Sequence, residues 1–188
     1  MNEDNISIEE LDNGDTLRTS TVNVFGNEVF TFVTGRAAVV RRWIYKIRYE
    51  HRFKRDKLVV GLGVQWRPSM ANPVAVLQFC VGGRCLIFQI LHANSIPRIL
   101  KRFLADDSTT FVGVNNYNDS YLLMRDYGLS VNRIFELGSV SRIRRASMET
   151  LARRILGFNG IRKPQWIGRS DWDDWWLTED QMGLPRGF

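Results

Sequence analysis

The stretch Leu58-Val59-Val60-Gly61-Leu62-Gly63-Val64-Gln65-Trp66 decides the fold of this 188-residue chain. It is an apolar run rich in β-branched residues, and its length suits a buried strand. A basic segment precedes it and Arg67-Pro68-Ser69 follows it, so the strand is bounded on both sides. Because side chains alternate along a strand, Gly63 and Gln65 point to the same face. The sequence therefore predicts a central strand with no charged side chain at these two positions.

Apolar patterns on both sides of this strand predict the rest of the fold. Alternation indicates strands, and a spacing of three to four residues indicates helices. The expected strands are 17–25, 28–34, 74–81, 84–91, 109–114 and 134–137, and the expected helices are 36–52, 95–105, 118–127 and 147–158. This succession predicts an α/β fold in which helices flank a mixed sheet. With 44% apolar residues, the chain suits one domain, expected over residues 16–188.

The formal net charge of +6 hides an uneven distribution. Residues 1–15 hold six acids and no base, and residues 171–188 hold five acids and Arg186. Residues 16–170 therefore hold 25 basic and 9 acidic residues, a net charge of +16. The acidic start predicts a disordered tail over residues 1–15. The basic body favours a polyanionic partner, most simply RNA or single-stranded DNA, and a solvated basic surface without a partner is the alternative.

The expected helix at 36–52 concentrates this positive charge. Its apolar residues recur at the spacing of one helix face. The opposite face carries Arg41, Arg42, Lys46 and Arg48. Arginine suits bidentate contact with phosphate better than lysine does. These four residues are the candidate nucleic-acid contacts, and the alternative is that their face is only solvated.

Two cysteines, Cys80 and Cys85, flank Gly82-Gly83. If the glycines form a two-residue hairpin turn, the cysteines face each other and the geometry permits a cross-strand disulfide. No window suits a transmembrane helix, and the N-terminus lacks the pattern of a secretory signal. We therefore expect an intracellular protein of the cytoplasm or nucleus with no membrane partner. In that reducing compartment two free thiols are favoured over the disulfide.

The C-terminal stretch contains a helix start without a helix body. Thr178 and Gln181 have the spacing of a capping box, which marks a helix N-terminus. Gly183, Pro185 and Gly187 follow at once and oppose a helix. The sequence therefore predicts a truncated C-terminal helix.

Four stretches are specific when taken together: residues 60–68 (VGLGVQWRP), 72–80 (NPVAVLQFC), 111–114 (FVGV) and 176–181 (WLTEDQ). With them, the chain resembles the Werner-syndrome-type 3′-5′ exonuclease domain, in particular its small plant relatives, from about residue 57 to 182. The resemblance implies the DnaQ-like group and a ribonuclease H-like fold. It also implies two-metal phosphodiester hydrolysis, in which four carboxylates hold two Mg²⁺ or Mn²⁺ ions and a tyrosine positions the attacking water.

The family pattern would place carboxylates at positions 63, 65, 119 and 188 and the tyrosine at 184. This sequence has Gly63, Gln65, Asp119, Phe188 and Leu184 at those positions, so only Asp119 is retained. A single carboxylate rarely holds Mg²⁺. We therefore expect no metal cofactor, with Mg²⁺ or Mn²⁺ at Asp119 if the protein is an active enzyme. As an alternative, Asp119 is only an acidic residue that the dipole of its helix favours.

Three functional hypotheses follow from the sequence. The first is a degenerate exonuclease-like domain that binds nucleic acid or a protein partner with little or no nuclease activity. The second is an active metal-dependent 3′-5′ exonuclease that trims RNA or DNA 3′ ends. The third is a homo-oligomeric scaffold, because loss of the last helix would leave apolar surface for another copy to cover. The missing carboxylates favour the first hypothesis over the second.

Overall fold

The computed structural model describes residues 6–14, 16–53, 58–69, 71–140, 147–159, 161 and 165–182. Its strands are β1 (Ile6–Gly14), β2 (Leu17–Val24), β3 (Asn27–Thr34), β4 (Leu58–Gln65), β5 (Val76–Val81), β6 (Arg84–Phe88), β7 (Thr109–Gly113) and β8 (Ile134–Glu136). Its helical segments are α1 (Ala37–Glu50), η2 (Ile90–His92), α2 (Arg98–Leu104), α3 (Asn116–Tyr127), α4 (Leu137–Val140), α5 (Met148–Leu151), the π-helical η3 (Ala152–Leu156), α6 (Gln165–Gly168) and α7 (Glu179–Met182). No helix among the described residues is long and apolar enough to cross a membrane.

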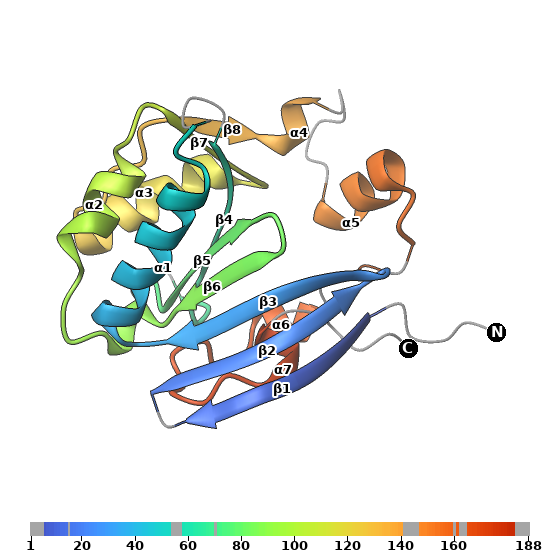
Figure 1. Ribbon diagram of the computed structural model, residues 1–188, viewed down its shortest axis with the longest axis horizontal. Helices are drawn as coiled ribbons and strands as arrows, with labels where there is room; N and C mark the ends of the chain where they lie inside the picture. The colour runs from blue at the N-terminus through green and yellow to red at the C-terminus, as the bar shows by residue number, and fades with distance from the viewer. Residues whose placement is uncertain are drawn as a thin grey trace.

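The strands of the described residues form an eight-stranded sheet with the order β1-β2-β3-β6-β5-β4-β7-β8. The pairs β3–β6, β4–β7 and β7–β8 are parallel, and the others are antiparallel. Helices α1, α2 and α3 gather beside the β4–β7 part of the sheet, while β1–β3 extend it away from them (Figure 1). The predicted α/β fold, with helices flanking a mixed sheet, is confirmed.

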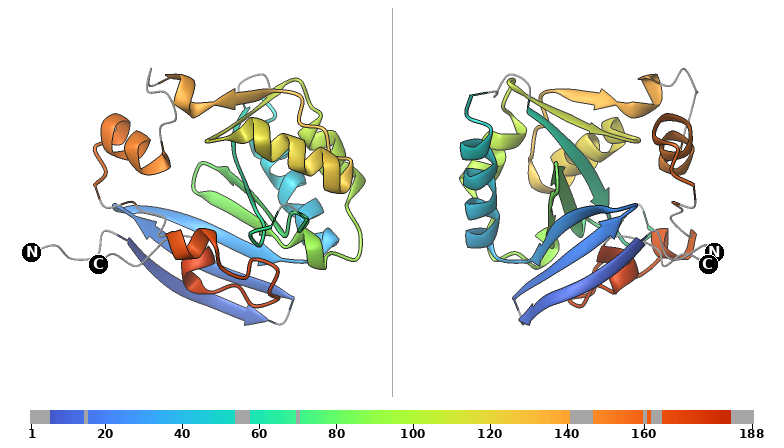
Figure 2. Two further views of the ribbon diagram at one scale, coloured as in Figure 1. Left: turned by 180° about the vertical axis from the view of Figure 1, so that it is seen from behind. Right: turned by 45° about the vertical axis from the view of Figure 1, so that its right-hand side comes forward.

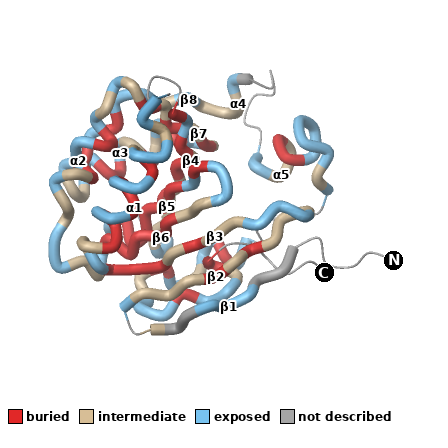
Figure 3. Tube along the Cα trace, in the orientation of Figure 1, coloured by how far each residue is buried: buried red, intermediate tan, exposed pale blue. Residues whose placement is uncertain are grey.

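Strand β4 has one face turned to the main apolar core. Leu58, Val60, Leu62 and Val64 are buried in a cluster that also contains residues of α1, α2 and α3. The members from α1 are Val40, Trp43, Ile44 and Ile47. Buried residues accordingly concentrate in β4, β5 and β6 (Figure 3). The alternation along β4 thus directs every second side chain toward the helices, as the sequence predicts.

The opposite face of β4 carries Gly63 and belongs to a different layer. Gly63 pairs with Gln78 of β5, and Gln78 pairs with Ile87 of β6, so these three positions lie on one face. Ile87 is part of a second apolar cluster that includes the C-terminal residues Ile167, Trp172, Leu177 and Met182. Figure 2 shows α6 and α7 lying against β1–β3 and away from α1. The C-terminal segment therefore covers the part of this face that lies beside Gly63.

Polar side chains in the sheet and just after β6 hold the C-terminal segment through its backbone carbonyls. Arg18 donates to the carbonyl of Leu177 at 2.8 Å, and Gln89 donates to that of Trp175 at 2.7 Å. The predicted capping box is confirmed, because Thr178 N donates to Gln181 Oε1 and Gln181 N donates to Thr178 Oγ1. Residues 183–188 lie outside the described residues, so the truncation of the last helix stays a prediction.

The disordered tail predicted for residues 1–15 is wrong for Ile6–Gly14. This segment is the edge strand β1, which pairs with β2 from Ile6↔Val24 to Gly14↔Leu17. Asn13 and Gly14 are the last residues of β1, where they pair with Arg18 and Leu17, and not the end of a tail. Acidic residues are tolerated because an edge strand is exposed to water, and Glu10 also pairs with Arg18 at 3.5 Å. Residues 1–5 and 15 lie outside the described residues.

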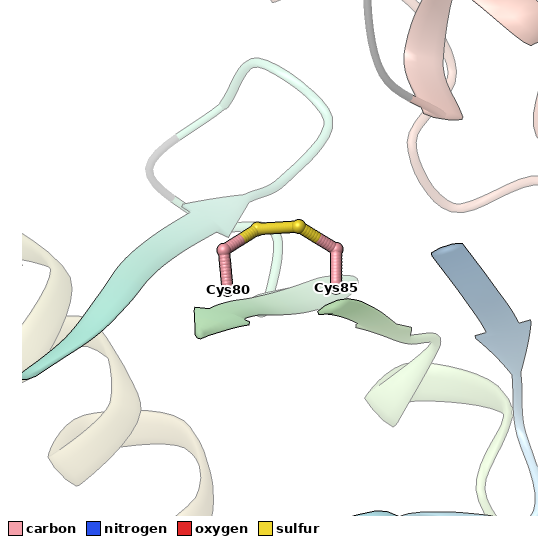
Figure 4. Close-up of a disulfide and its surroundings, with 2 residues drawn as sticks. All are labelled: Cys80 and Cys85. Carbon is pink, nitrogen blue, oxygen red and sulfur yellow. A yellow bond between two sulfur atoms is a disulfide. The ribbon is translucent and has the colours of Figure 1, made fainter. Parts of the chain in front are cut away.

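The prediction of two free thiols is also wrong. Cys80 and Cys85 form a disulfide across the β5–β6 hairpin (Figure 4), with their Cα atoms 4.2 Å apart. The two cysteines are cross-strand partners because Gly82-Gly83 forms the turn and Val81 pairs with Arg84. Such a pair has the close Cβ approach that a disulfide needs. The register of the hairpin brings the two cysteines together. The prediction of free thiols relied instead on an expected reducing compartment.

Candidate functional site

Gly63 lies opposite a side chain that closely approaches the position where a Cβ would be. A Cβ built on Gly63 would lie 3.0 Å from Oε1 of Gln78, its cross-strand partner. Gln78 is half-buried on the face that also carries Gln65. The blocking atom is the end of a flexible side chain, so a small residue at position 63 would displace it at little cost. The native pair Gly63–Gln78 nevertheless presents only a neutral amide at this point of the sheet.

The first turn of α3 meets β4 beside Gly63. Gly113, at the end of β7, packs so closely that a Cβ there would lie 2.5 Å from the carbonyl oxygen of Leu62 and would also contact the Asn116 side chain. Asp119 follows in the same turn of α3 and is only 6% exposed. The structure therefore brings three of the predicted site positions, Gly63, Gln65 and Asp119, to one region. Leu184 and Phe188 lie outside the described residues.

A carboxylate that the sequence analysis missed holds the N-terminus of α3. Glu136, at the end of β8, accepts hydrogen bonds from the backbone N–H of Asn115 at 2.8 Å and of Asn116 at 2.9 Å. An acid at this end of a helix is favoured by unpaired amides and by the helix dipole. The only signal in the sequence is an acid at the end of a strand, and it gains meaning when β8 is placed parallel to β7.

Asn115 and Asn116 give the start of α3 an unusual local structure. Asn115 has a left-handed backbone with φ of 65°, a conformation that asparagine tolerates better than most residues other than glycine. Asn116 is 0% exposed, and within the described part of the chain neither its Oδ1 nor its Nδ2 has a hydrogen-bond partner. A buried polar group without a partner costs about 1–3 kcal/mol of stability.

The side chains at this place do not fit a pair of divalent metal ions. Gly63 has no ligand atom, Gln65 has only a neutral carbonyl oxygen, and Asp119 supplies one carboxylate. Both oxygens of Glu136 already accept backbone hydrogen bonds. Among the residues that the structure describes, no three His, Cys, Asp or Glu side chains come together as a metal-binding group. Two-metal sites need several anionic oxygen ligands, and this donor set falls short of that requirement.

The four basic residues predicted on α1 separate into two groups. Lys46 pairs with Glu50 at 3.8 Å, and Arg48 pairs with Asp106 at 2.6 Å. Burial alone would raise the pKa of Asp106, but hydrogen bonds from Ser108 and the charge of Arg48 outweigh it and lower the pKa. Arg48 therefore has a role in joining α1 to the end of α2. Arg41 and Arg42 remain exposed on α1.

A groove between α1 and α2 gathers further basic residues around Arg41. It has a volume of about 360 Å³ and is lined by Arg41, Tyr45, Pro97, Arg98, Ile99 and Arg102. Arg98 and Arg102 come from α2 and were not among the candidate contacts on α1. The exposed spacing of Arg98 and Arg102 is visible in the sequence, but their approach to Arg41 depends on how the two helices pack.

Comparisons with known proteins give a consistent answer. A family model described as 3′-5′ exonuclease matches residues 66–183. The mouse bifunctional 3′-5′ exonuclease/ATP-dependent helicase WRN is 32% identical over 136 residues, which are 67% of this chain and 10% of that protein. An Arabidopsis thaliana 3′-5′ exonuclease is 27% identical over 143 residues, which are 69% of this chain and 49% of that protein. The chain thus spans half or less of the length of these relatives.

A solved structure shares the architecture. The crystal structure of the EXD2 exonuclease domain is 25% identical, with a TM-score of 0.54, and the match covers 80% of this chain and 79% of that chain. Crystals of that domain were also soaked in Mn and GMP. This likeness confirms the expected ribonuclease H-like fold.

Proposed function

Because the chain belongs to the 3′-5′ exonuclease domain family, we propose that it is a degenerate member that binds nucleic acid with little or no nuclease activity. The observation that carries this proposal is the pair Gly63–Gln78, in which a neutral amide lies where the family chemistry requires a carboxylate. Gln65, on the same face, adds no negative charge. The surface beside α3 is therefore short of the anionic oxygens that hold divalent ions.

The loss of one metal ligand would already weaken catalysis, and several are missing together. In two-metal hydrolysis the ions activate the attacking water and stabilise the leaving oxygen, so both ions must be held in place. Asp119 and the neutral amide oxygen of Gln65 are too few ligands to hold two ions. The retained acid has a sufficient structural explanation, since an acidic residue near the N-terminus of α3 is favoured by the helix dipole.

Nucleic acid is the partner that the charge of the chain supports best. Residues 16–170 carry a net charge of +16, and a charge of this size attracts phosphate backbones over a distance of several ångströms. The fold of the family is suited to a nucleic-acid substrate, and the basic surface persists where the catalytic groups do not. Binding without cleavage follows from this combination.

A 3′-end trimming assay tests the proposal directly. Purified protein is incubated with a 5′-labelled single-stranded RNA or DNA oligonucleotide and either Mg²⁺ or Mn²⁺, and products are resolved by length. We expect no ladder of shortened products, together with binding that weakens as salt rises. Stepwise trimming that chelator stops and that Asp119→Ala abolishes would overturn the proposal. The double variant Gly63→Asp/Gln65→Glu serves as a probe of how much of the site remains, since any gain of Mn²⁺-dependent activity would identify these two positions as the missing ligands.

A further inference from the structure

We propose that the groove between α1 and α2 is the place where single-stranded nucleic acid binds, on the side of the sheet opposite Gly63. This inference rests on the proposed nucleic-acid binding and adds its location. The lining contains three arginines, Arg41, Arg98 and Arg102, and no acid. Its chemistry fits the phosphates of a nucleic-acid strand.

The three arginines of the groove are available for a ligand. Among the described residues none of them makes an ion pair, whereas the acids nearest along α1 and α2 are engaged elsewhere. Glu50 pairs with Lys46 and with Arg84, and Asp106 pairs with Arg48. These ion pairs neutralise charges around the groove, whereas the three arginines inside the groove keep their positive charge. The electrostatic energy of a polyanion is therefore most favourable between the two helices.

Aromatic side chains give the groove a second means of recognition. Tyr45 lines it and is 57% exposed, and Tyr49, one turn further along α1, is 66% exposed. The guanidinium of Arg52, just after the end of α1, lies 4.2 Å from the centre of the Tyr49 ring and adds a basic group beside this aromatic one. Exposed rings beside a basic groove can stack unpaired bases, and such stacking is characteristic of proteins that bind single strands. A duplex keeps its bases inside and gains only the phosphate contacts.

The location of the groove follows from the two faces of α1. Val40, Ile44 and Ile47 pack on the apolar face of β4, so Arg41 and Tyr45 point away from the sheet. Gly63 lies on the other face of β4, beside the C-terminal segment. The proposed binding surface and the candidate site are therefore separated by the sheet. Binding at the groove does not require the chemistry that position 63 has lost.

Fluorescence anisotropy with labelled dT12 and rU12, at several salt concentrations, tests this assignment. The triple variant Arg41→Gln/Arg98→Gln/Arg102→Gln removes the three groove charges. Each lost phosphate contact lowers the slope of log K against log salt by about 0.7 for single strands. We expect the slope to fall by about 2 and the affinity at 100 mM salt to fall by at least tenfold.

The matched control removes the same number of charges elsewhere. Arg153, Arg154 and Arg169 are exposed and lie on η3 and just after α6. Their triple change to glutamine should alter the slope by less than about 0.5, because it removes no direct contact. Equal loss in the two triple variants would overturn the groove assignment and leave nucleic-acid binding intact. No binding by the unmodified protein at 25 mM salt would instead contradict the proposed function itself.

Tyr45→Ala separates single-strand recognition from attraction to any polyanion. Loss of one stacked base should weaken dT12 binding about tenfold while the salt slope stays unchanged. Poly-L-glutamate of similar charge offers no bases and should compete poorly with dT12. Unchanged affinity in Tyr45→Ala, equal competition by poly-L-glutamate, or tighter binding of a 12-base-pair duplex would each contradict the single-strand assignment.

Discussion

The two faces of β4 present different side chains, although they share one backbone. One face presents Leu58, Val60, Leu62 and Val64 to the helices and keeps an apolar core. The other presents Gly63 and Gln65, neither of which carries a charge. A strand can hold a fold together through one side while the residues on its other side vary, because successive side chains point in opposite directions. The face that stabilises the fold is therefore distinct from the face that carries the candidate site.

The largest effect should come from the apolar side of the sheet. Phe79 is fully buried against Phe103 and Phe111, with ring centres 5.8 and 6.3 Å away. Phe79→Ala should lower the free energy of unfolding by about 3–5 kcal/mol through lost burial and a new cavity. Its neighbour Gln78 points to the other face, and Gln78→Ala should cost less than about 1 kcal/mol. Urea denaturation of both variants measures this difference. Equal losses in the free energy of unfolding would contradict the prediction.

Two glycines near the candidate site provide a finer test. At Gly113 a new Cβ would lie 2.5 Å from the backbone oxygen of Leu62, which cannot move without shifting β4. Gly113→Ala should therefore cost about 2–3 kcal/mol through overpacking. At Gly63 the obstacle is the end of the Gln78 side chain, so Gly63→Ala should change stability by less than about 0.5 kcal/mol. Thermal unfolding compares them, and a larger loss at Gly63 would mean that Gln78 is fixed in place.

A substitution at the start of α3 should make the protein more stable. Asn116 is buried with both amide atoms unpaired among the described residues, so Asn116→Leu replaces an unsatisfied polar group with an apolar side chain. We expect a gain of about 1–2 kcal/mol in the free energy of unfolding. Asn118→Leu, two residues further along α3 and half-buried, is a control that should give no comparable gain. A loss of stability in Asn116→Leu would show that its amide has a bonding role.

At the other end of α3 we expect a smaller effect on stability that depends on pH. Tyr127 donates a hydrogen bond to the carbonyl of Val74 at 2.5 Å, and burial, aided by the charge of Asp126, raises the pKa of Tyr127 to about 12. The unfolded chain loses this proton near the ordinary pKa of 10.0. The stabilising contribution is therefore complete below pH 10 and is lost as pH rises through about 12.

Urea midpoints between pH 8 and pH 12 check this window. Tyr127→Phe should be less stable at pH 8 and should show a flatter decline above pH 10 than the unmodified protein. Tyr121→Phe is the matched control, because Tyr121 lies on the same helix and is 62% exposed. If both variants decline alike, the hydrogen bond to Val74 does not carry the pH dependence.

Much of the fold could be predicted from the sequence because local patterns encode it. The apolar run at β4, the Gly82-Gly83 turn, the amphipathic pattern of α1 and the capping box at Thr178 each reflect contacts within a few residues. The predicted strands and helices on either side of β4 accordingly have counterparts in the structure. The exception is β1, because its acidic composition predicts a disordered tail whereas Ile6–Gly14 pairs with β2.

The sequence by itself determined which face of each element is apolar, and the resemblance supplied the positions at which the family pattern expects carboxylates. Only the tertiary structure decided that Gln78 lies over Gly63, that Glu136 holds the start of α3, and that Arg98 and Arg102 join Arg41 in one groove. These contacts join residues far apart in the chain, and they depend on strand register and helix packing. Local patterns specify an element and its buried side, but the partner that each exposed side chain meets is set by the packing of the whole domain.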